Sequence, residues 1–129
     1  HLWTHTVLRS HHRKDRGISS AALERVRQTQ GIVGLMPSES MLRGPLDSFA
    51  LQQKLLAQSV GAEAVGLGSD LNAPLEGIRP DALGLLGPQG FFRQDQLGTL
   101  IQASRAHGAT FPSDLGLSRF LQAWARVNP

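Results

Sequence analysis

The sequence predicts an α/β fold with a parallel sheet, because short apolar strands alternate with amphipathic helices along the first 70 residues. This alternation favours parallel pairing through right-handed crossovers, with helices packed on the faces of the sheet. The chain has 129 residues, which is the length of a single domain. Three parallel strands fit either an open doubly wound sheet or part of a (β/α)8 barrel, since a complete barrel needs more than about 200 residues.

Three segments have the character of strands. Residues 2–8 are β-prone and alternate, which predicts that Trp3 and His5 share one face. Residues 31–37 are almost continuously apolar, as in a strand that is buried on both faces. Residues 64–70 form the third apolar strand.

The helices are predicted from caps and apolar spacing. The first begins at Ser19 or Ser20, turns Leu23 and Val26 to one face and ends at Gly31. The second spans residues 48–61 and turns Leu51, Leu55 and Leu56 inward. A loop rich in Gly and Pro follows the third strand, and the C-terminal helices are expected at 94–107 and 114–127.

Charge and composition exclude several classes of function. The net charge of +3 lies in one loop, residues 9–16, and the rest of the chain is neutral. A nucleic-acid binder would show a broader basic face with aromatic side chains for stacking, so we expect no nucleic-acid partner. A basic-loop binder of polyanions stays as an alternative. No apolar run approaches 18 residues, which predicts no transmembrane segment, and the absence of cysteine excludes disulfides and thiolate chemistry.

The ends of the strands carry the candidate chemistry, because ligands of parallel sheets bind at the carboxyl ends of their strands. Asp70 has the same strand parity as Gly66 and Gly68, so the glycines leave space for a ligand or metal below its carboxylate. The alternative is that Asp70 caps a turn and the glycines relieve packing against a helix. His5 ends its own strand and is either a metal ligand or a structural histidine.

Three segments in this order resemble the zinc-dependent membrane (renal) dipeptidase family. They read THTVLRSHHRKDRGISSAAL, LERVRQTQGIVGLMPS and VGAEAVGLGSDLNAP. The resemblance implies a (β/α)8 TIM barrel of which residues 1–129 are a partial domain: about three βα units plus terminal helices, with the N-terminal strands missing. It also implies that the whole protein hydrolyses dipeptides or related small amides with metal-activated water.

The resemblance assigns four residues. His5 matches a ligand of one of two zinc ions, Asp70 matches the catalytic carboxylate, and Arg16 matches the arginine that binds the substrate carboxylate. Asn72 stands where the family has a second acid, and we place it with Arg16 in substrate binding; Arg13 is a rival for the arginine role. The other zinc ligands would precede His1, so this chain alone is expected to be inactive. A non-catalytic barrel that acts as a binding protein is the alternative, and a homodimer is compatible with either.

Overall fold

The computed structural model describes residues 1–11, 17–37, 46–68 and 97–127 of the chain. Its centre is a parallel sheet with the strand order β1-β2-β3. The strands are β1 (Leu2–Thr6), β2 (Ile32–Leu35) and β3 (Val65–Leu67). The predicted α/β class and parallel pairing are therefore confirmed, and each strand is shorter than the apolar run that predicted it.

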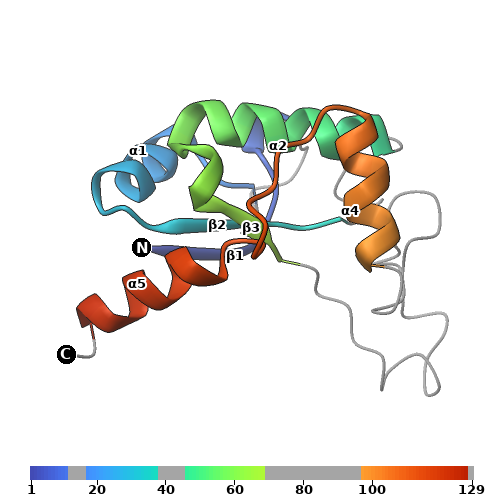
Figure 1. The fold of residues 1–129 in the computed structure, drawn as a ribbon. Coiled ribbons are helices and arrows are strands. Elements are labelled where there is room, and N and C mark those ends of the chain that lie inside the picture. Colours follow the sequence, from blue (N-terminus) through green and yellow to red (C-terminus); the bar gives the residue numbers. More distant parts are fainter. Residues whose placement is uncertain (12–16, 38–45, 69–96, 128–129) are drawn as a thin grey trace, which may run out of the picture.

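Helices lie on both faces of this sheet: α1 and α2 cover one face and α5 lies against the other (Figure 1). The α-helices are α1 (Ser20–Gln28), α2 (Leu46–Val60), α4 (Leu97–Ala106) and α5 (Leu117–Val127), and two short 3-10 helices span Arg9–His11 and Ala62–Ala64. As predicted, a serine caps α1: the Ser19 hydroxyl accepts a hydrogen bond from the Ala22 backbone N–H at 3.3 Å. Over the described ranges, no helix is both long and apolar enough to cross a membrane.

The core lies between the sheet and α1, α2 and α4. Phe49 and Leu56 of α2 are fully buried, and Phe49 stacks on Phe111 with ring centroids 5.8 Å apart. The prediction that Leu51 faces inward is wrong, because its side chain is 46% exposed. The buried face of α2 instead includes two glutamines, Gln52 and Gln53, which a prediction from the spacing of the leucines did not place inward.

Hydrogen bonds to backbone groups explain why these two glutamines are buried. Gln52 Oε1 accepts a hydrogen bond from the Leu8 N–H at 2.9 Å. Gln53 holds the backbone of Thr110 at both ends: its Oε1 accepts from the Thr110 N–H, and its amide donates to the Thr110 carbonyl. Each glutamine therefore satisfies backbone groups that would otherwise lose water on burial, and together they tie α2 to the segments after β1 and α4.

Helix α5 is attached through its arginines. The Arg126 guanidinium donates to Gln30 Oε1 at 2.9 Å and to the carbonyls of Thr29 and Gln30 at 3.4 and 3.5 Å. Arg119 donates to the Gly31 carbonyl at 3.5 Å. These contacts hold α5 to the loop between α1 and β2, while apolar side chains of the helix stay exposed. The exposed ones are Leu117, Leu121 and Trp124.

Candidate functional site

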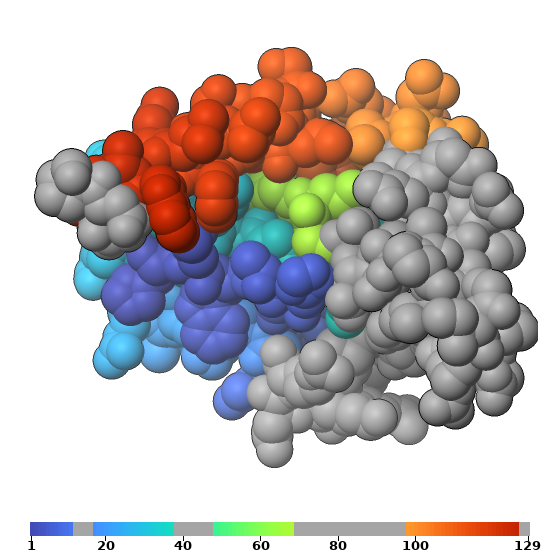
Figure 2. Space-filling model, turned by 90° about the horizontal axis from the view of Figure 1, so that it is seen from below, coloured from blue at the N-terminus to red at the C-terminus, as the bar shows by residue number. Residues whose placement is uncertain are grey.

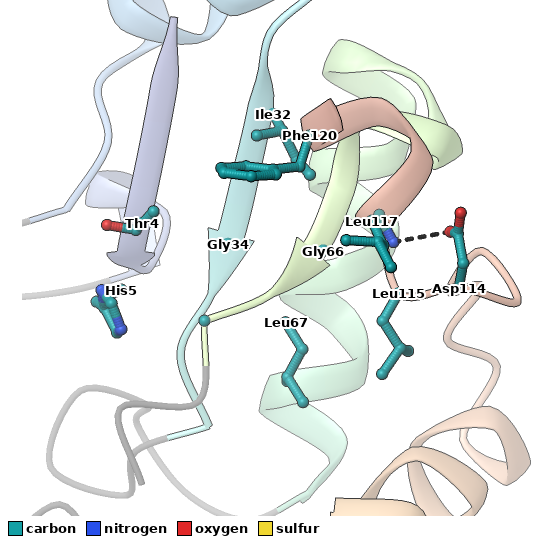
Figure 3. A pocket seen from close by; sticks show the side chains of 12 residues that line it. Thr4, His5, Ile32, Gly34, Gly66, Leu67, Asp114, Leu115, Leu117 and Phe120 are labelled. Carbon is teal, nitrogen blue, oxygen red and sulfur yellow. Dashed lines mark hydrogen bonds between the residues drawn. The ribbon is translucent and has the colours of Figure 1, made fainter. Parts of the chain in front are cut away.

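A pocket of about 350 Å³ opens on the face of the sheet that α1 and α2 do not cover. Its floor is the three strands and its wall is the start of α5 with the turn before it (Figure 3). From the same side, atoms of β2 and β3 are visible at the surface between β1 and the chain that leads into α5 (Figure 2). Three of the lining residues that come from the sheet and its end, Gly34, Gly66 and Gly68, are glycines, so this face of the sheet has few side chains.

The His5 side chain reaches this pocket because β1 contains a bulge. Trp3 pairs with Val33 and Thr6 pairs with Leu35, so two residues of β1 oppose the single residue Gly34. His5 is the extra residue, and it has the left-handed backbone angle φ 55°. Bulges of this kind re-aim side chains and are common next to active sites.

The bulge corrects one prediction from strand parity. Simple alternation placed His5 on the same face as Trp3, but Trp3 packs against the core under the helices. His5 instead lines the pocket beside Thr4, its neighbour in β1. Alternation fails here because an extra residue shifts the period by one, and nothing in the local sequence marks that shift.

Gly66 of β3 and Gly68, which directly follows β3, share the pocket face, as predicted, and each is needed for a different neighbour. A β-carbon on Gly66 would lie 2.7 Å from the Leu115 carbonyl oxygen, in the turn before α5. This agrees with the alternative reading, in which the glycine permits packing of a helical segment. A β-carbon on Gly68 would lie 2.7 Å from the His5 backbone nitrogen and 2.8 Å from the Gly34 carbonyl oxygen.

The turn before α5 is ordered by Asp114. Its carboxylate accepts hydrogen bonds from the backbone N–H groups of Gly116 at 3.0 Å and Ser118 at 2.9 Å. The hydrogen bonds from the Ser118 hydroxyl and backbone, followed by that from Gly116, lower the pKa of Asp114. Leu115, which lies between Asp114 and Gly116, has φ 54°. The Asp114 carboxylate therefore stabilises both a left-handed turn and the first turn of α5.

Of the four predicted site residues, only His5 can be located. Arg16, Asp70 and Asn72, together with the rival Arg13, lie outside the described residues. The His5 side chain is exposed, and no described residue hydrogen-bonds to its imidazole. Within the ranges 1–11, 17–37, 46–68 and 97–127, no three His, Asp or Glu side chains are grouped to hold a metal ion.

Sequence reasoning missed several residues of the pocket. Gly34 lies inside an apolar strand, and the same signal that singled out Gly66 and Gly68 could have found it. The contribution of α5, through Leu117 and Phe120, had no signal in the sequence. An amphipathic helix shows which of its faces is apolar, but not which surface that face covers.

Comparison with solved structures identifies the fold. A metallopeptidase from Rhodobacter sphaeroides, liganded with a phosphinate mimic of the dipeptide L-Ala-D-Ala, superposes with a TM-score of 0.76 at 24% identity. The chain folds like part of a metallopeptidase. A dipeptidase of metallopeptidase family M19 gives a TM-score of 0.70 at 24% identity, and an amidohydrolase from Pseudomonas aeruginosa gives 0.66 at 18%. The predicted resemblance to dipeptidases is thus confirmed at the level of the fold.

The similarity covers this chain almost completely and the relatives only in part. It spans 97% of this chain and 35% of the Rhodobacter sphaeroides metallopeptidase, and 98% and 35% for the dipeptidase of family M19. For the amidohydrolase the figures are 98% and 44%. No protein-family model matches the chain, and no curated protein is significantly similar to it in sequence.

Proposed function

We propose that this chain is the C-terminal portion of a zinc-dependent dipeptidase, and that the whole protein hydrolyses dipeptides or related small amides. The observation that carries the proposal is the bulge near the carboxyl end of β1, which turns His5 into the pocket on the open face of the sheet. Chemistry in parallel α/β folds gathers at that end. A phosphinate mimic of a dipeptide is bound by a relative of the same fold, which supports a dipeptide as the substrate class.

Chain connectivity supports a role for Asp70 in the same site. Gly68 contacts the backbone of His5, and Asp70 follows Gly68 by two residues. Two residues of extended chain span at most about 7 Å, so we propose that Asp70 and His5 serve the same site. Together, an imidazole and a carboxylate at the carboxyl ends of parallel strands can bind a metal ion and transfer a proton in a metal-dependent hydrolase.

Each assigned residue has a defined task. The exposed imidazole of His5, free of hydrogen bonds to the described residues, can offer a neutral nitrogen to a zinc ion. Asp70 would hold and pass on the proton of the attacking water. Arg16, with Asn72, would grip the terminal carboxylate of the dipeptide, because a guanidinium binds a carboxylate through two hydrogen bonds. When bound, a two-zinc centre polarises the scissile carbonyl and lowers the pKa of the water.

The test uses the longest natural protein that contains these 129 residues. We expect it to bind zinc and to hydrolyse L-Ala-D-Ala. His5→Ala should lower the zinc content, whereas Asp70→Asn should keep the zinc and lower kcat by about 100-fold or more. Arg16→Ala should mainly raise KM; if Arg13→Ala does so instead, the two arginines exchange roles.

Other outcomes would reject the proposal. A protein that binds no zinc and hydrolyses no dipeptide would be a barrel with a binding role only. Near-normal turnover of Asp70→Asn would remove that carboxylate from the mechanism. The 129-residue chain by itself is the matched control, and we expect it to be inactive because it supplies His5 without a complete set of zinc ligands.

A further inference from the structure

We propose that Gly68 is the positioning residue of His5: its bare Cα lets β1 and β3 meet across Gly34, and this contact holds the bulged histidine in the orientation that a metal ligand needs. The proposal rests on the proposed function for the identity of the ligand. The geometric part, that Gly68 fixes His5, stands on the contacts of the described residues alone.

The first step of the argument is the close approach of two strands that are not neighbours. The strand order is β1-β2-β3, so β1 and β3 are separated by β2. Nevertheless, a β-carbon on Gly68 would come within 2.7 Å of the His5 backbone nitrogen. At the carboxyl end of the sheet, the residue after β3 therefore lies against the backbone of the bulge in β1.

The second step is that Gly34 lies beneath this contact and permits it. A β-carbon on Gly34 would lie 3.2 Å from the Gly68 Cα and 3.5 Å from the Thr4 Cα. Gly34 is also the residue that the two bulge residues of β1 oppose. At this point neither Gly34 nor Gly68 has a side chain. A β-carbon on Gly68 would clash with backbone atoms of His5 and Gly34, whereas one on Gly34 would be tight against the Gly68 Cα.

The third step links the contact to the conformation of His5. A histidine with φ 55° occupies the left-handed region, which non-glycine residues adopt only when the surroundings hold them there. On one side, Met36 donates its backbone N–H to the Thr6 carbonyl at 2.9 Å, which fixes the chain just after the bulge. On the other side, the contact of His5 with Gly68 fixes the bulge itself. Without that contact, the bulge between the fixed pairs Trp3–Val33 and Thr6–Leu35 is free to change its backbone angles, which would turn the imidazole away from the pocket.

The chain offers a matched control two residues before Gly68, at Gly66 of β3. Gly66→Ala creates a clash of the same severity, 2.7 Å to a backbone oxygen, but the clash is with Leu115 and not with β1. Both variants lose a strand glycine and both disturb packing. Only Gly68→Ala acts on the contact that we infer to hold His5.

The experiment uses the 129-residue chain with isotope-labelled histidine, which limits the NMR spectrum to five residues. In the wild type, a positive φ brings the His5 amide and α protons close together and gives a strong intraresidue contact. We expect Gly68→Ala to lose this contact and Gly66→Ala to retain it. Gly34→Ala is the milder second variant should Gly68→Ala fail to fold, and it should weaken the contact partially.

A zinc measurement on the longest natural protein completes the test. There Gly68→Ala should lower zinc affinity about 10- to 100-fold, the range seen when a group that orients a ligand is lost. Gly98→Ala on α4, where an added β-carbon has no atom within 4 Å, should not. A positive φ of His5 that survives both Gly68→Ala and Gly34→Ala would overturn the proposal, as would equal effects of Gly66→Ala. If His5 moves as expected but the wild type binds no zinc, the positioning role stands and the proposed function fails.

Discussion

The two faces of the sheet are built from opposite kinds of residue. Under α1 and α2, the strands present Val33, Leu35 and Val65, all fully buried against large side chains such as Phe49. On the other face the same strands present glycines, and a pocket is left open. One face is therefore filled to give stability, while the other keeps side chains away from a strand end that carries a histidine. The following predictions test this difference between the filled face and the open face.

The largest effect is expected on the filled face, at Phe49. Phe49→Ala removes a fully buried ring that stacks on Phe111. It should lower the free energy of unfolding by about 3–5 kcal/mol, as large-to-small changes in a packed core do. Chemical denaturation measures it, with Leu51→Ala as the control. Because Leu51 is half exposed, its removal should change the free energy by less than about 0.5 kcal/mol; equal losses would contradict the core described above.

On the open side, the exposed apolar side chains of α5 predict self-association of the chain. Leu117, Leu121 and Trp124 are each more than half exposed on one helix. A patch of this kind promotes contact with another molecule. We expect Leu121→Lys to weaken self-association about tenfold or more in analytical ultracentrifugation. Leu51→Lys, a comparable change on α2, should leave it unchanged, and a wild type that stays monomeric at high concentration would contradict the prediction.

Two glycines should respond to the same substitution with opposite signs. Gly98 of α4 has no atom within 4 Å of an added β-carbon, so Gly98→Ala should stabilise the protein by about 0.5–1 kcal/mol through helix propensity. Gly34 lies on the open face, and Gly34→Ala should destabilise by about 1 kcal/mol, because the new methyl meets Gly68. Thermal unfolding measures both, and a stabilising Gly34→Ala would show that the open face has spare room at this point.

The smallest effect is expected at Asp114 and depends on pH. Hydrogen bonds lower the pKa of this carboxyl in the folded state, so the unfolded state binds its proton more tightly. Its contribution to stability is therefore full above about pH 4, the ordinary range of an aspartate, and is lost as the pH falls through the lowered value. Asp114→Asn should have a lower Tm than the wild type at pH 7, and the gap should shrink below pH 4. A difference in Tm that does not depend on pH would show that the charge of Asp114 does not contribute to stability.

Much of the fold could be predicted from the sequence because local signals and burial agree there. Ser19 caps α1, and Leu23 and Val26 face the core, as their spacing indicates. Leu51 was predicted wrongly because Gln52 and Gln53 are buried by hydrogen bonds to backbone far away in the chain, at Leu8 and Thr110. A pattern of apolar residues cannot report such partners.

For the candidate site, residue types were more informative than periodicity. The glycines of β3 and the histidine of β1 were found because glycine inside a strand and histidine at its end are unusual for packing alone. The face of His5 was not found, because a bulge depends on pairing with Gly34 and on the contact with Gly68, both distant in sequence. The roles of Arg16, Asp70 and Asn72 stay predictions.

The hydrogen bonds from Arg126 and Arg119 to main-chain carbonyls determine which mutations the loop between α1 and β2 can accept. Every residue type has a carbonyl oxygen, so a substitution at Thr29 leaves its acceptor in place. Gly31 is different, because a β-carbon there would clash with the His1 carbonyl oxygen. An insertion or deletion in the same loop would move the acceptors out of reach. The connection between α1 and β2 should therefore tolerate a substitution at Thr29 far better than a change in its length.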